Sequence, residues 1–216
     1  MKTDQQGSAL PGRMPPLIIR WTVGDVSEYG FAALRMSLCG MWRLFGEQAR
    51  YVVCVNTVPI LRVQELTGDL PAAVTWRDTT EEFPRFLEPF FDEHKAEGVG
   101  WKFAPLQLDP ACRELALDND CILWRLPRAI ERWLQMSGSF LLAEDVKACF
   151  GQFSEICGLE PRNSGIRGLP AGFDLERALL EVLNKHQLTL CSELDEQGLQ
   201  TAVINPYSPS SSPQTK

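Results

Sequence analysis

Two short apolar runs on either side of an amphipathic stretch constrain the fold of this chain more than any other feature. The runs "LIIRWTV" (17–23) and "YVVCV" (51–55) have the length of strands, and the second is apolar throughout, as in a strand covered on both faces. Between them, apolar residues recur at helical spacing, with Ser27 placed to cap a helix and Gly46 placed to end it. Strand, helix and strand of these lengths predict a βαβ unit, and therefore an α/β fold with parallel strands.

The remainder of the chain continues this alternation. Further strands are predicted at 72–76, 115–117, 139–143 and 188–191. Further helices are predicted at 79–91, where Pro89 kinks or ends the helix, at 101–108, from Pro127 onward, at 173–186 with Asp174 as N-cap, and at 195–204. We expect one α/β domain over 17–204, an αβα sandwich with a mixed, mostly parallel sheet. The polar ends, 1–16 and 205–216, are predicted to be disordered.

The charge of the chain limits the ligands that it can bind. The sequence has 21 Lys and Arg residues against 28 Asp and Glu residues, a net charge of −7. The basic residues form no long block, whereas binding to a nucleic acid or an anionic membrane needs clustered cations. We therefore expect no nucleic-acid partner. A small anionic ligand bridged to the protein by a divalent cation is compatible with an acidic chain.

Cysteine usage and hydropathy indicate the compartment. The seven cysteines are irregularly spaced and none forms a C-x-x-C pair, which is typical of free thiols in a reducing environment. The first residues lack the apolar core of a signal peptide, and no apolar run approaches the roughly 18 residues that span a bilayer. These observations predict a soluble, cytoplasmic protein without a transmembrane segment.

Two aspartates around an asparagine form the most informative polar motif. In "RELALDNDCILW" (113–124), Asp118 and Asp120 stand between two apolar runs. On an extended strand two residues apart point to the same side, and two such carboxylates are tolerable when Mg²⁺ or Mn²⁺ neutralises them. The alternative is a plain turn joining two strands, because Asp and Asn favour turns. Spacing alone leaves both interpretations open.

The context of this motif resembles the nucleotide-sugar-dependent glycosyltransferases of the GT-A fold. In that family, an element that carries a lysine precedes a short strand that ends in the metal-binding D-x-D. In this sequence, "WKFAPLQL" (101–108) stands at the place of that element. "NSGIRGLP" (163–170) is similar to the family's segment that lines the donor-sugar and acceptor pocket. "LDEQGLQTAV" (194–203) looks like the Asp-Glu-Gln segment that opens a helix beside the reaction centre. The resemblance covers roughly residues 17–204.

The resemblance implies a role for each matching residue. Asp118 and Asp120 would hold Mn²⁺ or Mg²⁺, with Asp120 as the more direct ligand. The backbone groups of Thr22 and Val23, at the end of the first strand, would contact the nucleotide. The residues expected to contact the sugar or the diphosphate are Lys102, Asn163, Asp195 and Gln197. Asp195 is the candidate catalytic residue, because a carboxylate can orient a sugar hydroxyl. The expected partners are a nucleoside-diphosphate sugar and an acceptor that the sequence does not identify.

These residues also have structural interpretations. Asn163 could begin a turn, Asp195 could cap the last helix, and Lys102 could be a solvated lysine. The sequence also departs from the many family members that have a metal-binding histidine near the C-terminus, since its own histidines are His94 and His186. A catalytically degenerate protein that binds a nucleotide sugar or a protein partner is therefore the second hypothesis. A nucleotidyltransferase is the third, although "TVGDVSEYG" has no Lys or Arg to hold a phosphate.

Overall fold

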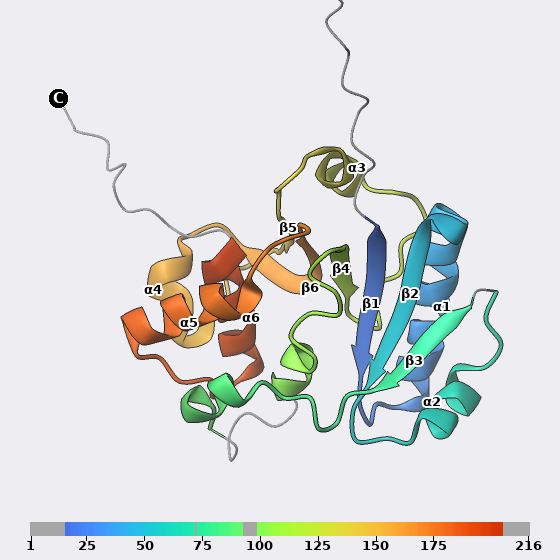
Figure 1. The fold of residues 1–216 in the computed structure, drawn as a ribbon, viewed down its shortest axis with the longest axis horizontal. Coiled ribbons are helices and arrows are strands. Elements are labelled where there is room, and N and C mark those ends of the chain that lie inside the picture. Colours follow the sequence, from blue (N-terminus) through green and yellow to red (C-terminus); the bar gives the residue numbers. More distant parts are fainter. Residues whose placement is uncertain (1–15, 72, 93–98, 205–216) are drawn as a thin grey trace, which may run out of the picture.

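The computed structural model describes residues 16–71, 73–92 and 99–204. Over these residues, six strands form one mixed sheet in the order β3-β2-β1-β4-β6-β5 (Figure 1). The strands are β1 (Leu17–Val23), β2 (Ala49–Val55), β3 (Val74–Asp78), β4 (Arg113–Leu117), β5 (Leu141–Glu144) and β6 (Arg162–Leu169). β1 pairs in parallel with β2 and β4, and β2 with β3, whereas β6 is antiparallel to β4 and β5. The α/β class and the mixed, mostly parallel sheet predicted from the sequence are confirmed.

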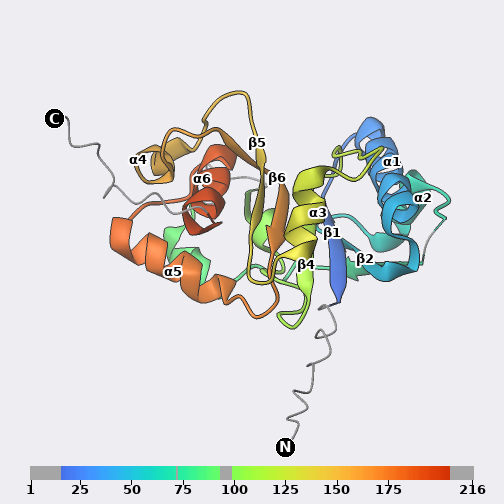
Figure 2. The ribbon, with the colours of Figure 1, turned by 90° about the horizontal axis from the view of Figure 1, so that it is seen from above.

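Helices pack on both faces of this sheet. The α-helices are α1 (Glu28–Phe45), α2 (Ile60–Thr67), α3 (Arg128–Gln135), α4 (Ser154–Cys157), α5 (Leu175–His186) and α6 (Glu193–Ile204). The 3-10 helices are η1 (Gly46–Gln48), η2 (Arg85–Phe90), η3 (Val99–Phe103) and η4 (Gly151–Phe153). Figure 2 shows α1 and α2 together at one end of the molecule and α4, α5 and α6 at the other, with the strands between them. No helix among the described residues is long and apolar enough to cross a membrane.

The first hydrophobic core lies between the sheet and helices α1, α2 and α3. Alternate residues of β1, Ile19 and Trp21, point into it and have no exposed surface. The residues that α1 buries there include Phe31, Leu34, Leu38, Met41 and Phe45. The Ser27 side chain accepts a hydrogen bond from Gly30 N, and the helix ends at Gly46, as the sequence predicts. Local periodicity and capping thus define the βαβ unit that the rest of the sheet extends.

The second core lies on the opposite side, where α5 and α6 pack with η2, η3 and η4. Leu179 and Leu183 of α5 and Leu199 of α6 are fully buried in it. The Asp174 side chain accepts a hydrogen bond from Arg177 N, which confirms the predicted N-cap of α5. Because this core also covers one face of β6, it holds α6 against the strands that carry the polar residues of the next section.

The structure corrects several of the predicted elements. Residues 188–191 form no strand, since Leu190 makes only an isolated bridge with Phe91. The helix predicted at 79–91 is reduced to the 3-10 helix η2, because Pro84 precedes it and Pro89 lies inside it. The strand β6 and the helix α2 were not predicted. The predicted disorder of residues 1–16 and 205–216 lies outside the described residues, apart from residue 16.

Gly198 permits the close approach of α6 to η4. A Cβ atom at this position would lie 2.3 Å from the carbonyl oxygen of Phe150 and 2.7 Å from Cβ of Phe153. We expect Gly198→Ala to lower the free energy of unfolding by about 2 kcal/mol, because backbone cannot yield as a flexible side chain does. Urea unfolding followed by circular dichroism would measure this change. A variant at least as stable as the parent, as helix propensity alone predicts, would contradict the contact.

Candidate functional site

The sheet changes its winding direction between β1 and β4, and this point positions the candidate site. From β1 the chain proceeds outward through β2 and β3, and β4 then pairs on the other side of β1. In open α/β sheets, ligands bind outside the carboxyl ends of the strands at such a point. Trp21 pairs with Leu117 across β1 and β4. Thr22 and Asp118 therefore leave neighbouring strands at the same level.

A cavity of about 420 Å³ lies at these strand ends. Its wall includes seven of the eight residues that the sequence predicted for the site: Thr22, Val23, Lys102, Asp118, Asp120, Asn163 and Gln197. Other residues of the wall are Gly24, Trp101, Asn119, Ser164, Glu193 and Glu196. The fold thus gathers side chains from β1, η3, the end of β4, β6 and α6 around one space.

The Asp-Asn-Asp motif is both a turn and part of this wall. The carbonyl oxygen of Asp118 accepts a hydrogen bond of 3.0 Å from Cys121 N, which closes the turn. Asp118 N donates to Gly165 O on β6 at 2.8 Å, and the Asn119 side chain donates to Gly30 O on α1 at 3.1 Å. The two interpretations of the motif therefore do not exclude each other. The turn directs the carboxyl group of Asp118 toward the cavity, where it is half-buried, while Asp120 is exposed.

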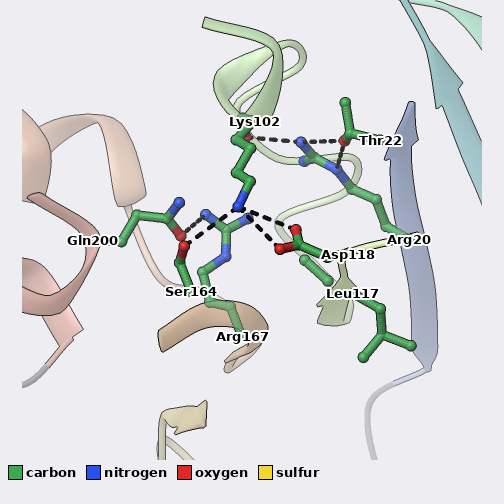
Figure 3. A pocket seen from close by; sticks show the side chains of 9 residues that line it. Arg20, Thr22, Lys102, Leu117, Asp118, Ser164, Arg167 and Gln200 are labelled. Carbon is green, nitrogen blue, oxygen red and sulfur yellow. Dashed lines mark hydrogen bonds and ion pairs between the residues drawn. The ribbon is translucent and has the colours of Figure 1, made fainter. Parts of the chain in front are cut away.

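Lys102 meets Asp118 inside the cavity. Its Nζ lies 3.1 Å from Oδ1 and 3.2 Å from Oδ2 of Asp118, and 3.5 Å from Oγ of Ser164 (Figure 3). Oε2 of Glu196 also lies 3.5 Å from this Nζ. Burial alone would lower the pKa of Lys102, but the charges of Glu196 and Asp118 outweigh it and raise the pKa. The ammonium group is therefore charged, and Lys102 is not the solvated lysine of the structural interpretation.

Glu196 is a site residue that sequence reasoning missed. It is only 2% exposed, its Oε2 accepts from Ser164 Oγ at 3.2 Å, and its Oε1 has no hydrogen-bond partner among the described residues. Burial raises the pKa of Glu196, against the opposing charge of Lys102. The sequence did contain a clue to Glu196, because it is the acidic residue that follows Asp195 in the same segment. Neighbouring residues of a helix point about 100° apart. The choice between Asp195 and Glu196 therefore required knowing which face of the helix is turned toward the cavity.

Asp195 itself is directed away from the cavity wall. Its carboxylate accepts hydrogen bonds from Gln152 N at 2.7 Å, Cys191 N at 2.9 Å and Ser192 Oγ at 3.0 Å. The side chain is 2% exposed and does not line the cavity. These contacts fix the segment before α6 to η4, a role close to the structural interpretation, and the described contacts of Asp195 are with the protein itself.

Asn163 and Gln197 connect the cavity wall to neighbouring segments. Asn163 Nδ2 donates to Asp145 Oδ2 at 3.0 Å, and its Oδ1 accepts from Gly165 N at 2.6 Å. Gln197 accepts from Ser164 N at 3.3 Å and donates to the carbonyl of residue 149 at 2.8 Å. Asn163 lies in β6 and so does not begin the turn that the structural interpretation suggested.

Trp101 closes the cavity beside the end of β1. A Cβ atom at Gly24 would lie 2.1 Å from the Trp101 ring, so the ring rests against the glycine backbone. Thr22, Val23 and Val26 line the same part of the wall. A flat aromatic surface in the wall of a cavity suits the binding of another planar group.

A buried ion cluster supports the floor of the cavity. Glu114 has no exposed surface and lies 3.2 Å from Arg20 and 3.5 Å from Arg167. Arg20 also donates to Thr22 Oγ1 and to the carbonyl of Lys102, and Arg167 donates to Gln200 at 2.6 Å (Figure 3). Burial, together with the charge of Arg20, lowers the pKa of Arg167 to about 10. The cluster joins β1, β4, β6 and α6 directly beneath Lys102.

The charges of the wall determine which ligands can enter. Among the described lining residues, one ammonium group faces the carboxylates of Asp118, Asp120, Glu193 and Glu196. An anionic ligand needs further positive charge here, which a divalent cation would supply. The described residues contain no group of three or more His, Cys, Asp or Glu side chains placed to hold a metal. Mg²⁺ commonly takes one or two carboxylates and completes its shell with water and phosphate, so Asp118 and Asp120 fit such a cation.

Of the two histidines, only His186 can be placed relative to this site. His186 is the last residue of α5 and does not line the cavity. His94 lies outside the described residues.

Comparison with known proteins places the fold. No protein-family model and no curated protein sequence matches the chain. Among solved structures, the galactosyltransferase LgtC in complex with donor and acceptor sugar analogues aligns with a TM-score of 0.52 at 13% identity, over 85% of this chain and 70% of LgtC. The bifunctional glycosyltransferase WbbM aligns with a TM-score of 0.54 at 15% identity, over 92% of this chain and 39% of WbbM. The chain has a GT-A-type glycosyltransferase fold. In this GT-A-type fold, the cavity occupies the carboxyl edge of the sheet described above.

Proposed function

We propose that this chain binds a nucleoside-diphosphate sugar in the cavity, with Mn²⁺ or Mg²⁺, and transfers the sugar to an acceptor. The observation that carries the proposal is the grouping of seven predicted residues, from five separate segments, around one cavity of a GT-A-type fold. Their side chains include the carboxylates, amide and ammonium that a sugar diphosphate with a cation requires. An acceptor class is not part of the proposal.

The wall suggests a role for each of its parts. The backbone of Thr22 and Val23, with the Trp101 ring beside them, would hold the base and ribose. Asp118 and Asp120 would hold the cation, which when bound neutralises the negative charge of the departing diphosphate. Asn163 and Gln197 would orient the sugar, since both amides are already fixed by hydrogen bonds. Within the Asp-Glu-Gln segment, Glu196 rather than Asp195 is the carboxylate that lines this space, and it would accept a hydrogen bond from a sugar hydroxyl.

A second candidate function is binding of the nucleotide sugar without transfer. It is favoured by the donor set, in which Asp118 and Asp120 lack a third acidic or histidine ligand among the described residues. The pairing of Lys102 with Asp118 also leaves the carboxylate engaged. Consumption of a donor sugar in the presence of candidate acceptors and water would separate the two functions, since a binding protein leaves the donor intact.

Thermal shift with UDP, GDP and their sugars, each with and without Mn²⁺, tests the proposal. A nucleotide at about 100 times its dissociation constant adds roughly 2.7 kcal/mol to the free energy of unfolding. For a domain of this size, that free energy raises the melting temperature by roughly 5–10 °C. We expect one base to give this shift when Mn²⁺ is present. The absence of a shift with every nucleotide, in a folded sample, would contradict the proposal.

A further inference from the structure

The ammonium group of Lys102 is surrounded by oxygen atoms in the cavity. Both carboxylate oxygens of Asp118, Oε2 of Glu196 and Oγ of Ser164 lie within 3.5 Å of its Nζ. These oxygens come from the turn after β4, from α6 and from β6, and Figure 3 shows the ammonium group directed at Asp118 and Ser164. Oxygen atoms of this kind are also the ligands that hard divalent cations prefer.

A divalent cation and an ammonium group cannot share one carboxylate at these distances. Both oxygens of Asp118 are engaged by Lys102, and a cation bound there would lie within a few ångströms of the ammonium group, where like charges repel strongly. We propose that Lys102 is a built-in counter-cation that blocks Asp118 and has to move away for a divalent cation to bind. The proposal rests on the function proposed above.

Glu196 is the place to which Lys102 can move. Its Oε2 already lies 3.5 Å from the ammonium group, and its Oε1 is buried without a hydrogen-bond partner among the described residues. A shift of the ammonium group toward Glu196 would pair this second oxygen and neutralise a buried carboxylate, while it releases Asp118. The main chain need not change, because the lysine side chain has four rotatable carbon–carbon bonds.

The competition makes binding of the cation depend on the nucleotide. Without the nucleotide, a cation gains the carboxylate of Asp118 only by displacing the ammonium group. With the nucleotide, phosphate oxygens add to the shell of the cation and also attract the displaced lysine. Lys102 therefore keeps the affinity of the cavity for the cation alone low, and cation and nucleotide bind cooperatively.

Calorimetric titration of Mn²⁺ into the nucleotide-free protein tests this inference. We expect Lys102→Met to bind Mn²⁺ at least about tenfold more tightly than the parent, because the competing charge is gone. Lys185→Met removes the same charge from an exposed position that does not line the cavity, and it should leave the affinity unchanged. If the role of Lys102 were purely structural, Lys102→Met would instead bind Mn²⁺ more weakly than the parent, because its cavity would be distorted. Unchanged or weaker Mn²⁺ binding by Lys102→Met, or no binding by any variant, would overturn the inference.

Two further measurements keep the outcomes separate. If Lys102→Met is too unstable to titrate, Lys102→Met/Glu196→Gln removes both charges of the buried pair, and the same gain in Mn²⁺ affinity is expected. Thermal shift with the nucleotides reports on the function independently. Nucleotide binding by the parent, with no gain in Mn²⁺ affinity in either variant, would overturn the inference and leave the proposed function. A gain in Mn²⁺ affinity with no nucleotide binding would support the competition at Asp118 and overturn the function.

Discussion

Replacement of Glu114 by glutamine should lower the free energy of unfolding by about 3–5 kcal/mol, because it leaves two buried guanidinium groups without their carboxylate. Glu114 has no exposed surface, and its Oε1 lies 3.2 Å from Arg20 and 3.5 Å from Arg167. Its Oε2 also accepts a hydrogen bond of 2.8 Å from the backbone N of Leu108.

Urea unfolding of Glu114→Gln and two comparison variants measures the effect. Glu181→Gln removes a carboxylate from an exposed pair with Arg177 on α5 and should leave the stability almost unchanged. The triple variant Arg20→Met/Glu114→Leu/Arg167→Met should recover most of the loss, since apolar groups of similar volume often replace a buried ion cluster at little cost. Equal stability of Glu114→Gln and Glu181→Gln would contradict the buried cluster.

Substitution of Asp118 by asparagine should abolish the stabilisation by nucleotide and Mn²⁺. The variant keeps the size of the side chain but removes the charge that a cation needs, and we expect the nucleotide affinity measured with Mn²⁺ to fall by about 100-fold or more. Thermal shift and calorimetry of the purified variant would measure this loss.

Asp69→Asn is the matched control for this substitution. Asp69 is exposed, follows α2 and does not line the cavity, so its loss should change neither the melting temperature nor the affinity appreciably. Retention of the full nucleotide-dependent shift by Asp118→Asn would contradict the role of the turn in binding the diphosphate.

The parts of the fold that depend on local pattern could be predicted from the sequence. Ser27 and Asp174 cap helices as expected, because a cap is set by residues three positions apart. β6 was missed, because it carries buried polar residues and its Arg167 is compensated by Glu114, a partner 53 residues away. The apolar residues 188–191 were expected to form a strand. Leu190 is buried in the core instead, and it makes only an isolated bridge with Phe91.

The candidate site was predictable as a set of segments, but the orientation of its side chains was not. The order of Lys102, the Asp-Asn-Asp motif and the segment that begins at Asn163 matches that of the GT-A family, and this resemblance led to the expectation of one pocket. The contact of Lys102 with Asp118, and the choice of Glu196 over Asp195, depend on how β4, η3 and α6 pack together. Contacts between segments that are distant in the sequence produce no periodic pattern of residues, so they could not be predicted in this way.

Backbone amide chemical shifts during a nucleotide titration test the central claim most directly. For the 24.3 kDa chain, two-dimensional spectra with the stabilising nucleotide and Mg²⁺ would map the binding site residue by residue. We expect the largest changes at the amides of Thr22, Gly24, Asn119, Asp120 and Ser164, which meet at the carboxyl ends of β1 and β4. Changes confined to another hollow, such as the groove that Met36 of α1 and Trp124 line, would contradict a nucleotide-sugar site in this cavity.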